Sequence, residues 1–545
     1  MVEISSNKPK GVIIPDPNLA RLCKKTKVTE ADLLPCLQQY DLIDALHTLG
    51  VASSTFDKWG EAVHFDKATG FYFGQYVLAY FTSMLILSYG IDEQGYRLGD
   101  NSDNVKALVW LYDNALADPF REAANDETHI DSAYSWIVRT AFEQMSFQFV
   151  RNYLIARNLV LFCDLSNQLS SDNLGSFNEV FSQQTGLPIA EFLKIAFIVY
   201  VGLITNPPFV NTTSYTMADI PGLKVDLCGE RVMSFINVLQ GDYNRFRNDD
   251  SLKNRDLNKE FTKYRYNPLF RFPIVKPDAN IIGKMFVVPN TPIYVLRAFG
   301  GLFWWFDDYY KERQLQDEYR QHFGKVLFED YVGIILKGIY GERSVVKGSS
   351  LPYGSKKCRV SEFGDWFVVR QGKLYLFEVK AVQFSLLSRQ TGDKCRIVQE
   401  EIPRMTKAIK QLFRRVSNIE TYEELKQFRG LKVVPIAVFY DVPTPLERAL
   451  NDWIKADLRE AENENGLAGI SKFQYHYLDI KQLELYDGCA DLIDLDEALS
   501  DLSAADNFRD KLIEKRKGGL KNRLLDRRLD EFFDTIIEPQ FRNVK

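Results

Sequence analysis

The chain has 545 residues, of which 46% are hydrophobic and 26% are charged, and its formal net charge is -5. At roughly 150 to 200 residues per domain this length predicts about three folded domains with an ordinary globular composition. The mild negative charge excludes nucleic-acid binding through overall positive charge, so any such contact must come from local basic patches.

The cysteines and histidines show no metal-binding pattern. Seven cysteines are scattered without a Cys-x-x-Cys pair, and the five histidines are equally isolated. This argues against a zinc site or an HNH-type nuclease centre. An odd, dispersed set of cysteines without a signal peptide indicates reduced thiols and predicts a cytoplasmic protein.

The first part of the chain predicts a helical domain over residues 1–240. A helix start is indicated at Thr29, and apolar residues recur every three to four positions over 104–116, 133–158 and 189–201. Such a domain could serve recognition, sensing or oligomerisation.

Two apolar stretches, 71–90 and 192–210, approach the length that spans a bilayer. Gln75 interrupts the first and Lys194 the second, so both are poor membrane spans. We therefore expect buried helices of the helical domain and no membrane association.

A polar segment over 241–265 predicts a linker. Cations then alternate with aromatic residues up to position 271, a composition used on phosphate backbones and exposed bases. Lys263, Arg265 and Arg271 are the candidate nucleic-acid contacts here. A solvated linker that runs into a strand explains the same residues.

Two short apolar runs, 269–275 and 284–288, predict paired strands across a turn-rich segment. A hairpin at this place would either extend the sheet of the following domain or link that sheet to the helical domain.

The most informative segment is a second predicted hairpin, with arms at 365–370 and 374–380. A turn centred on Gln371-Gly372 pairs Asp365 with Glu378, and directly opposed residues have Cβ atoms about 4.5 to 5.5 Å apart. Because side chains alternate with period two, Lys380 shares the face of Glu378. Apolar neighbours on both faces predict strands at the centre of a sheet covered by helices.

Two carboxylates at this separation repel each other unless a cation lies between them, and Mg2+ is a common oxygen-liganded cation. Water bound to such an ion is suited to attack a phosphodiester, and Lys380 would lie beside it. The alternative is a buried lysine-carboxylate network with a structural role.

An acid on one strand followed by Glu-x-Lys on the next resembles the core of the PD-(D/E)XK nuclease superfamily, which has the restriction-endonuclease-like fold. The resemblance covers about residues 315–445, and Gly364 stands where the family usually has proline before the acid. It implies phosphodiester hydrolysis, mostly of DNA. Asp365, Glu378 and the Val379 carbonyl would hold Mg2+, for which Mn2+ could substitute, and Lys380 would orient or deprotonate the attacking water.

The family usually adds an acid from a helix before the hairpin. The helix predicted over 321–336 offers Glu329 as a further catalytic residue and metal ligand, since it shares an otherwise apolar stripe with Val326 and Val332. Pairing of Glu329 with Lys325 or with solvent is the alternative.

The family also tends to present a polar residue from a helix after the hairpin. The helix predicted over 403–416 begins with a proline, which suits a first turn, and offers Gln411. Lys407 lies on the same side, but a solvated helix face explains it equally well.

The remaining elements predict the order of the family's core, with a strand over 431–440, a helix over 446–459 and an edge strand over 473–479. We therefore expect a multidomain α and α/β protein in which a large N-terminal helical domain precedes a restriction-endonuclease-like core with a mixed sheet. The expected division is a helical domain over 1–240, a linker over 241–265, a nuclease domain over 266–490 that includes the leading hairpin, and a basic helical tail over 491–545.

The tail is rich in cations. Residues 507–528 hold nine Lys or Arg against three acids, and the run Lys515-Arg516-Lys517 is a candidate contact to a DNA backbone. A charged, solvent-facing helix paired with its own acids is the competing interpretation.

Together with the resemblance, these features predict a Mg2+-dependent endonuclease, and DNA is favoured over RNA as its substrate because the resembling family mostly acts on DNA. A partner protein or a homodimer could be involved, and no nucleotide cofactor is evident. By analogy, a role in bacterial or phage-related defence is expected. The alternatives are a nuclease-derived binding module that does not cleave and a strand-cutting subunit of a transposition-like complex.

Overall fold

The computed structural model describes the greater part of the chain. The described residues are 16–59, 64–66, 71–72, 75–100, 102–116, 151–169, 171, 173–216, 219–249, 267–278, 286–354, 361–385, 388, 394–442, 447–464, 466–500, 508–515 and 522–538.

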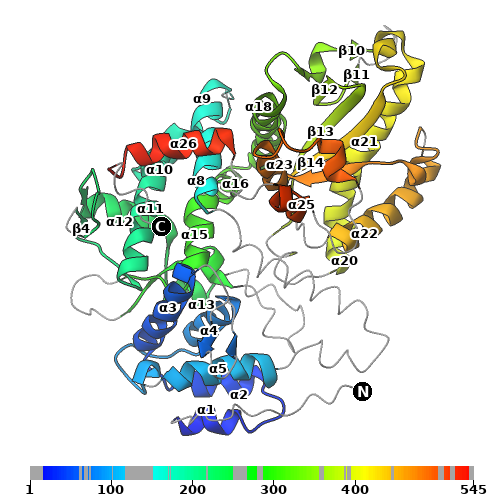
Figure 1. Cartoon of the computed structure of the whole chain (residues 1–545). Coiled ribbons are helices and arrows are strands. Elements are labelled where there is room, and N and C mark those ends of the chain that lie inside the picture. The colour runs from blue at the N-terminus through cyan, green and yellow to red at the C-terminus, as the bar shows by residue number, and fades with distance from the viewer. Residues whose placement is uncertain are drawn as a thin grey trace. The chain divides into compact units, whose positions relative to one another are not determined.

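The chain forms two units (Figure 1). Unit 1 comprises residues 1–155, 181–302 and 533–545, and unit 2 comprises 156–180 and 303–532. This division differs from the expected linear one, because 156–180 packs with the later part of the chain. Within unit 2, the ring of Phe162 lies 5.4 Å from that of Phe306 and 5.8 Å from that of Phe323.

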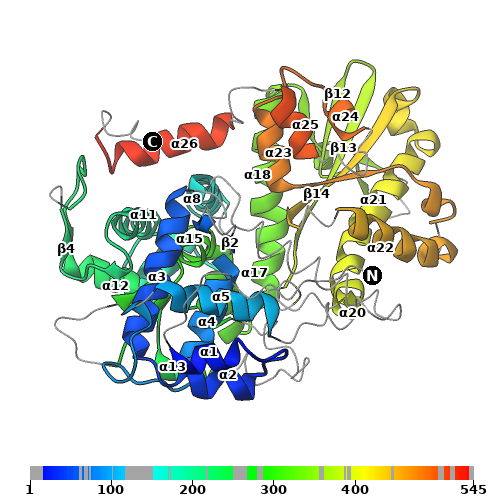
Figure 2. The same cartoon turned by 60° about the horizontal axis from the view of Figure 1, so that its bottom comes forward.

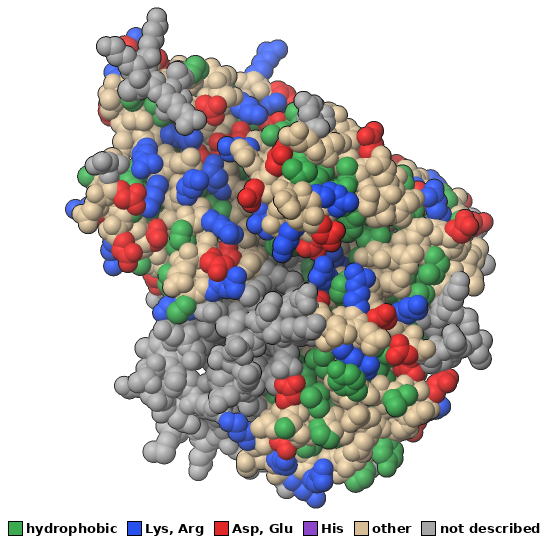
Figure 3. All heavy atoms as spheres, turned by 180° about the vertical axis from the view of Figure 1, so that it is seen from behind, with side chains coloured by type: hydrophobic (Ala, Val, Ile, Leu, Met, Phe, Trp, Pro, Cys, Tyr) green, Lys and Arg blue, Asp and Glu red, His purple; other side chains and the backbone are tan. Residues whose placement is uncertain are grey.

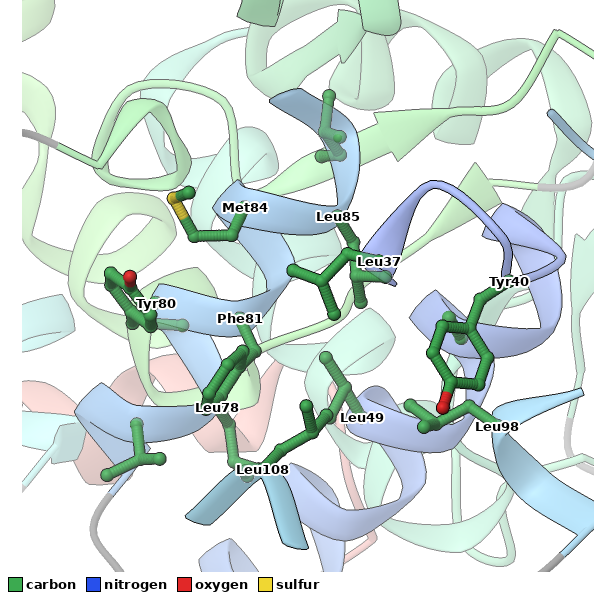
Figure 4. Packing of buried hydrophobic residues seen from close by; sticks show 14 of the residues in the cluster. Leu37, Tyr40, Leu49, Leu78, Tyr80, Phe81, Met84, Leu85, Leu98 and Leu108 are labelled. Carbon is green, nitrogen blue, oxygen red and sulfur yellow. The ribbon is translucent and has the colours of Figure 1, made fainter. Parts of the chain in front are cut away.

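Unit 1 is mostly helical, as expected for the N-terminal region. Its main helices are α1 (Pro17–Leu22), α2 (Glu30–Leu37), α3 (Leu42–Trp59), α4 (Gln75–Leu87), α5 (Ser102–Asn114), α11 (Ile189–Thr205), α12 (Gly229–Leu239), α13 (Tyr243–Arg247) and α15 (Thr291–Gly300). The predicted start at Thr29 is confirmed, since the Thr29 amide donates to Asp32 Oδ2 at 3.0 Å in a capping box. Leucine and aromatic side chains of α2, α3, α4 and α5 form a continuous core (Figure 4).

The strands of unit 1 are short. They form a four-stranded sheet in the order β3 (Phe209–Val210), β8 (Phe286–Val287), β7 (Ile274–Lys276), β6 (Gln240–Asp242), and two-stranded sheets of β1 (His64–Asp66) with β2 (Phe71–Tyr72) and β4 (Ser214–Tyr215) with β5 (Leu227–Cys228). The predicted pairing of 269–275 with 284–288 is present between β7 and β8. Of the two alternatives for this hairpin, extension of the later sheet is wrong, because β7 and β8 pair with β6 and β3 in a separate sheet of unit 1. The strand also begins late, since Asn267 Oδ1 accepts from the Leu269 amide at 3.0 Å and starts a helical turn over Pro268–Phe270.

Unit 2 is built on a five-stranded mixed sheet in the order β15 (His476–Asp479), β14 (Lys432–Asp441), β13 (Lys373–Gln383), β12 (Trp366–Arg370), β9 (Val345–Lys347). β13, β14 and β15 are parallel, whereas β12 is antiparallel to both β13 and β9. The predicted strand at 431–440 and the edge strand at 473–479 are thereby confirmed.

Helices cover both faces of this sheet. α18 (Glu329–Tyr340) and α23 (Ile480–Asp487) lie on one face, and α21 (Ile402–Thr421) and α22 (Glu447–Glu460) lie on the other (Figures 1 and 2). The helices predicted at 321–336, 403–416 and 446–459 are confirmed. The first of them contains a π-helical stretch, Phe323–Phe328, which follows α17 (Gln316–His322) and precedes Glu329.

The other helices are shorter or join the two units. α8 (Arg151–Leu159), α10 (Phe177–Thr185), α16 (Leu302–Glu312) and α26 (Arg523–Asp534) each contain a unit boundary. Unit 2 also contains α9 (Ser166–Gln168), α20 (Lys394–Arg396), α24 (Leu495–Leu499), α25 (Phe508–Lys515) and the pair β10 (Pro352–Tyr353) and β11 (Ser361–Glu362).

Within the described part of the chain, no single helix has the length and apolar character needed to cross a membrane. α10 and α11 together meet that test, with a bend of 59° between them. On the face shown in Figure 3, basic and acidic side chains are interspersed, as the small net charge leads one to expect.

Candidate active site

The hairpin of β12 and β13 has the predicted register. Trp366 pairs with Phe377 and Arg370 with Lys373, which leaves Gln371-Gly372 as a two-residue turn. Both turn residues have positive φ, 51° and 73°, as the tightest hairpin turns require. The turn therefore fixes which residues of the two strands face each other.

Two backbone hydrogen bonds fix the position of Asp365 directly before β12. Its amide donates to the Phe377 carbonyl at 3.0 Å, and its carbonyl accepts from the Gly348 amide at 2.9 Å. Gly364 before it has φ 75°, and a β-carbon there would lie 2.7 Å from Cδ1 of Leu376. The position before the acid is thus one that only glycine fills without strain.

Three oxygen atoms converge on the ammonium group of Lys380. Its Nζ lies 2.5 Å from Glu378 Oε1, 3.1 Å from the Val379 carbonyl oxygen and 3.4 Å from Asp365 Oδ2. Asp365 Oδ2 also accepts from the Val379 amide at 2.6 Å. The structure therefore brings together four of the residues that the sequence predicted for the site.

The acids of this cluster are held away from solvent. The Glu378 side chain is 0% exposed and that of Asp365 is 10% exposed, whereas the Lys380 side chain is 29% exposed. Since a buried carboxylate is costly without partners, both oxygens of Glu378 are engaged, Oε1 by Lys380 and Oε2 by Arg415 of α21. The cluster is accessible from the lysine side.

Arg415 is a site residue that the sequence analysis missed. It lies one helical turn after Gln411 on α21, and its Nε also donates to the Glu362 carbonyl at 3.2 Å. The spacing of four from Gln411 is a signal that could have identified it, because residues four apart share a helix face.

Glu329 approaches the cluster from α18, on the other face of the sheet. The indole Nε1 of Trp366 donates to the Glu329 carbonyl at 2.8 Å, and Lys347 Nζ lies 3.9 Å from Glu329 Oε1. Burial and the negative charge of Asp365 raise the pKa of Glu329 to about 7. The ion pair of Glu329 is therefore with Lys347 and not with Lys325, the partner named in the alternative interpretation.

Two amide side chains, one on α21 and one at the end of β13, have buried oxygens without a hydrogen-bond partner among the described residues, Gln411 Oε1 and Gln383 Oε1. Gln383 follows an irregularity in the β13–β14 register after Lys380, of the kind that changes the direction of a side chain. No contact places Gln411 on Asp365, Glu378 or Lys380 within the described residues, so its predicted catalytic role stays a prediction.

The donor atoms fit Mg2+ in kind, because two carboxylates and one carbonyl oxygen are ligands that this ion prefers. In the part of the chain that the structure describes, however, no three His, Cys, Asp or Glu residues lie close enough to hold a metal ion together. The predicted set of Glu329, Asp365 and Glu378 is therefore not assembled as three carboxylate ligands around one point. The convergent set is Asp365, Glu378 and the Val379 carbonyl.

The predicted nucleic-acid contacts are only partly described. Lys263, Arg265, Arg516 and Lys517 lie outside the described residues. Arg271 is exposed in unit 1, where its guanidinium lies 5.4 Å from the ring of Phe272, and Lys515 is exposed in unit 2.

No family model, curated protein or solved structure matches the chain. The class of this protein must therefore be inferred from the mixed sheet of unit 2 and from the residues gathered on its central hairpin.

Proposed function

We propose that the protein is a metal-dependent nuclease that hydrolyses phosphodiester bonds, with DNA as its substrate and with its active site on the β12–β13 hairpin. The observation that carries this proposal is the convergence of Asp365 Oδ2, Glu378 Oε1 and the Val379 carbonyl on Lys380 Nζ. Such a group of oxygens beside an amine combines the ligands for a hard cation with a charge suited to a phosphate.

The architecture of unit 2 supports a restriction-endonuclease-like core. A helix, an antiparallel hairpin, a second helix and a strand parallel to β13 occur in this order along the chain, as α18, β12–β13, α21 and β14. This is the order expected from the resemblance to the PD-(D/E)XK superfamily.

Each residue has a distinct role in this proposal. Asp365, Glu378 and the Val379 carbonyl would hold Mg2+, which when bound lowers the pKa of a coordinated water and neutralises charge on the phosphate. Lys380 would orient the attacking water through Nζ and stabilise negative charge on the phosphate oxygens. Glu329, whose raised pKa lets it exchange a proton near neutral pH, would accept a proton at its carboxylate.

A second candidate function is binding of nucleic acid without cleavage. It is favoured by the ion pairs of Glu378 with two cations, Lys380 and Arg415, which compensate the charge of this acid without a metal ion. The two functions differ in whether a metal ion binds at the hairpin and in whether a phosphodiester bond is broken.

The test combines cleavage and metal binding. The protein is incubated with linear duplex DNA, supercoiled plasmid, single-stranded DNA and RNA, with Mg2+ or Mn2+ against EDTA, and Mn2+ binding is measured by calorimetry. The proposal expects metal-dependent cleavage that Asp365→Asn and Lys380→Ala abolish, and Mn2+ binding that Asp365→Asn weakens.

Asp494→Asn is the matched control, because Asp494 accepts from Lys373 Nζ at 2.9 Å near the opposite end of the same hairpin. Asparagine at this position keeps the helix cap, so cleavage should be unchanged. Equal cleavage by wild type, Asp365→Asn and Lys380→Ala would overturn the site assignment. Nucleic-acid binding without cleavage and without Mn2+ binding would favour the second function.

A further inference from the structure

Helix α21 carries an unusual excess of positive charge. Its twenty residues include five cations, Arg404, Lys407, Lys410, Arg414 and Arg415, and a single acid, Glu420, in the last turn. The neighbouring helix α22, by contrast, alternates acids and bases along its sequence. Mixed signs are usual on a helix face that only needs to be soluble, so the composition of α21 calls for another explanation.

The cations of α21 lie on one side of the helix. At about 100° per residue, all five fall within an arc of about 140°, together with Gln411 and Asn418. The opposite side is buried against the sheet through Met405, Ala408, Ile409 and Leu412. We call the cationic side, from Arg404 to Arg415, the basic face of α21.

The basic face begins at the candidate active site. Arg415 lies at the edge of this arc and pairs with Glu378, and Arg414, its neighbour in the sequence, has an exposed side chain further along the arc. From Arg414 to Arg404 the face extends over about 15 Å at 1.5 Å per residue, the axial length of about four base pairs of duplex DNA.

Lys407 and Arg414 are the two cations of the basic face whose charge is available to a ligand. Arg404 lies 3.3 Å from Glu401, and Lys410 lies 2.9 Å from Glu464, so their charges are partly neutralised. Lys407 and Arg414 are exposed, and no ion pair joins either of them to another of the described residues.

We infer that the basic face of α21 binds the phosphate backbone of duplex DNA and leads it to the hairpin site. This inference rests on the proposed nuclease function and adds the surface that holds the substrate. A rigid helix with cations along one side suits a regular backbone, and phosphate contacts of this kind position DNA without reading its sequence.

The test compares two double variants with the same change of charge. Lys407→Glu with Arg414→Glu alters the basic face, whereas Lys455→Glu with Arg459→Glu alters two exposed cations of α22 that have no ion pair in the described part of the chain. Binding of a fluorescent DNA duplex is followed by anisotropy over a range of salt concentrations, with EDTA present to prevent cleavage. Circular dichroism and thermal unfolding of each variant establish that it is folded.

The first variant should bind duplex at least about tenfold more weakly, whatever the sequence of the duplex, and the slope of log affinity against log salt should fall by about two. The α22 variant should bind within about twofold of wild type. Equal loss in both variants, no loss in either, or no binding of duplex by wild type would overturn the inference. Loss of cleavage in Asp365→Asn together with unchanged binding by the α21 variant would refute this surface and leave the nuclease function standing.

Discussion

Gly333 of α18 faces the indole ring of Trp366 so closely that a β-carbon at position 333 would overlap the ring. The same indole donates a hydrogen bond to the Glu329 carbonyl one turn earlier. Trp366 thereby joins the helix that carries Glu329 to the strand that follows Asp365, and the absence of a side chain at position 333 is what permits the contact.

Gly333→Ala should therefore destabilise the protein although alanine favours helices. We expect a loss of about 1 to 3 kcal/mol, the usual cost of overpacking a well-filled contact, measured by urea denaturation. Gly338→Ala on the same helix is the control, because its β-carbon would meet only Asp487 Oδ1 at 3.7 Å. That variant should be neutral or more stable by up to about 1 kcal/mol. Equal effects of the two substitutions would contradict this account.

Gly364→Pro introduces the residue that the resembling family usually has before its acid. We expect this substitution to destabilise the folded protein. Proline holds φ near about -65°, whereas Gly364 has φ 75°. Gly364→Ala should lower the free energy of unfolding, measured by urea denaturation, by about 2 kcal/mol or more. The reason is that the backbone strain and the close contact with Leu376 add to each other. Gly430→Ala has a similar φ, 81°, with nothing within 4 Å, so it should show the backbone cost alone. A loss at position 430 as large as that at position 364 would remove the role assigned to Leu376.

Stability should depend on pH through Glu329. The pKa of this carboxyl is raised in the folded state, from 4.5 to about 7, so the folded protein binds its proton more tightly than the unfolded chain does. Its contribution to stability is therefore present below about pH 4.5 and is lost as the pH rises to about 7. Thermal unfolding of wild type and Glu329→Gln across this range should show wild type losing stability relative to the variant as the pH increases. Parallel curves would show that Glu329 has an ordinary pKa.

The pairing of Arg415 with Glu378 should stabilise the folded chain without metal. Removing one partner of a buried ion pair leaves the other charge poorly compensated. Arg415→Gln should therefore lower the free energy of unfolding, measured by urea denaturation, by about 3 kcal/mol. The double variant with Glu378→Gln should lose less than the sum of the two single variants. Lys407→Gln on the exposed side of α21 is the control, with an expected change below about 0.5 kcal/mol. Additive effects in the double variant would show that the two side chains do not interact.

The register of the hairpin could be predicted from sequence because it depends on local features. Gln371-Gly372 permits the positive φ angles of a two-residue turn, and alternation with period two then assigns Glu378 and Lys380 to one face. The convergence on Lys380 Nζ follows from that register.

The role of Arg415 could not be predicted in the same way. α21 has five cations, and which of them turns toward Glu378 depends on how the helix is seated on the sheet. The membership of residues 156–180 in unit 2 was equally hidden, because an apolar helical segment has the same pattern whichever core it joins. Only the packing of Phe162 on Phe306 and Phe323 decides between the two cores.

The division of the chain between the units also sets the order in which the units can be completed during synthesis. The chain passes from one unit to the other at four places, and unit 1 receives its last segment, 533–545, after all of unit 2 has been made. Two backbone hydrogen bonds connect that segment to the rest of unit 1. The amide of Lys224 donates to the Ile536 carbonyl at 2.8 Å, and the amide of Glu538 donates to the Gly222 carbonyl at 2.9 Å. Unit 1 can therefore be completed only after all of unit 2 has been translated. No single continuous fragment of the chain contains the whole of either unit without part of the other.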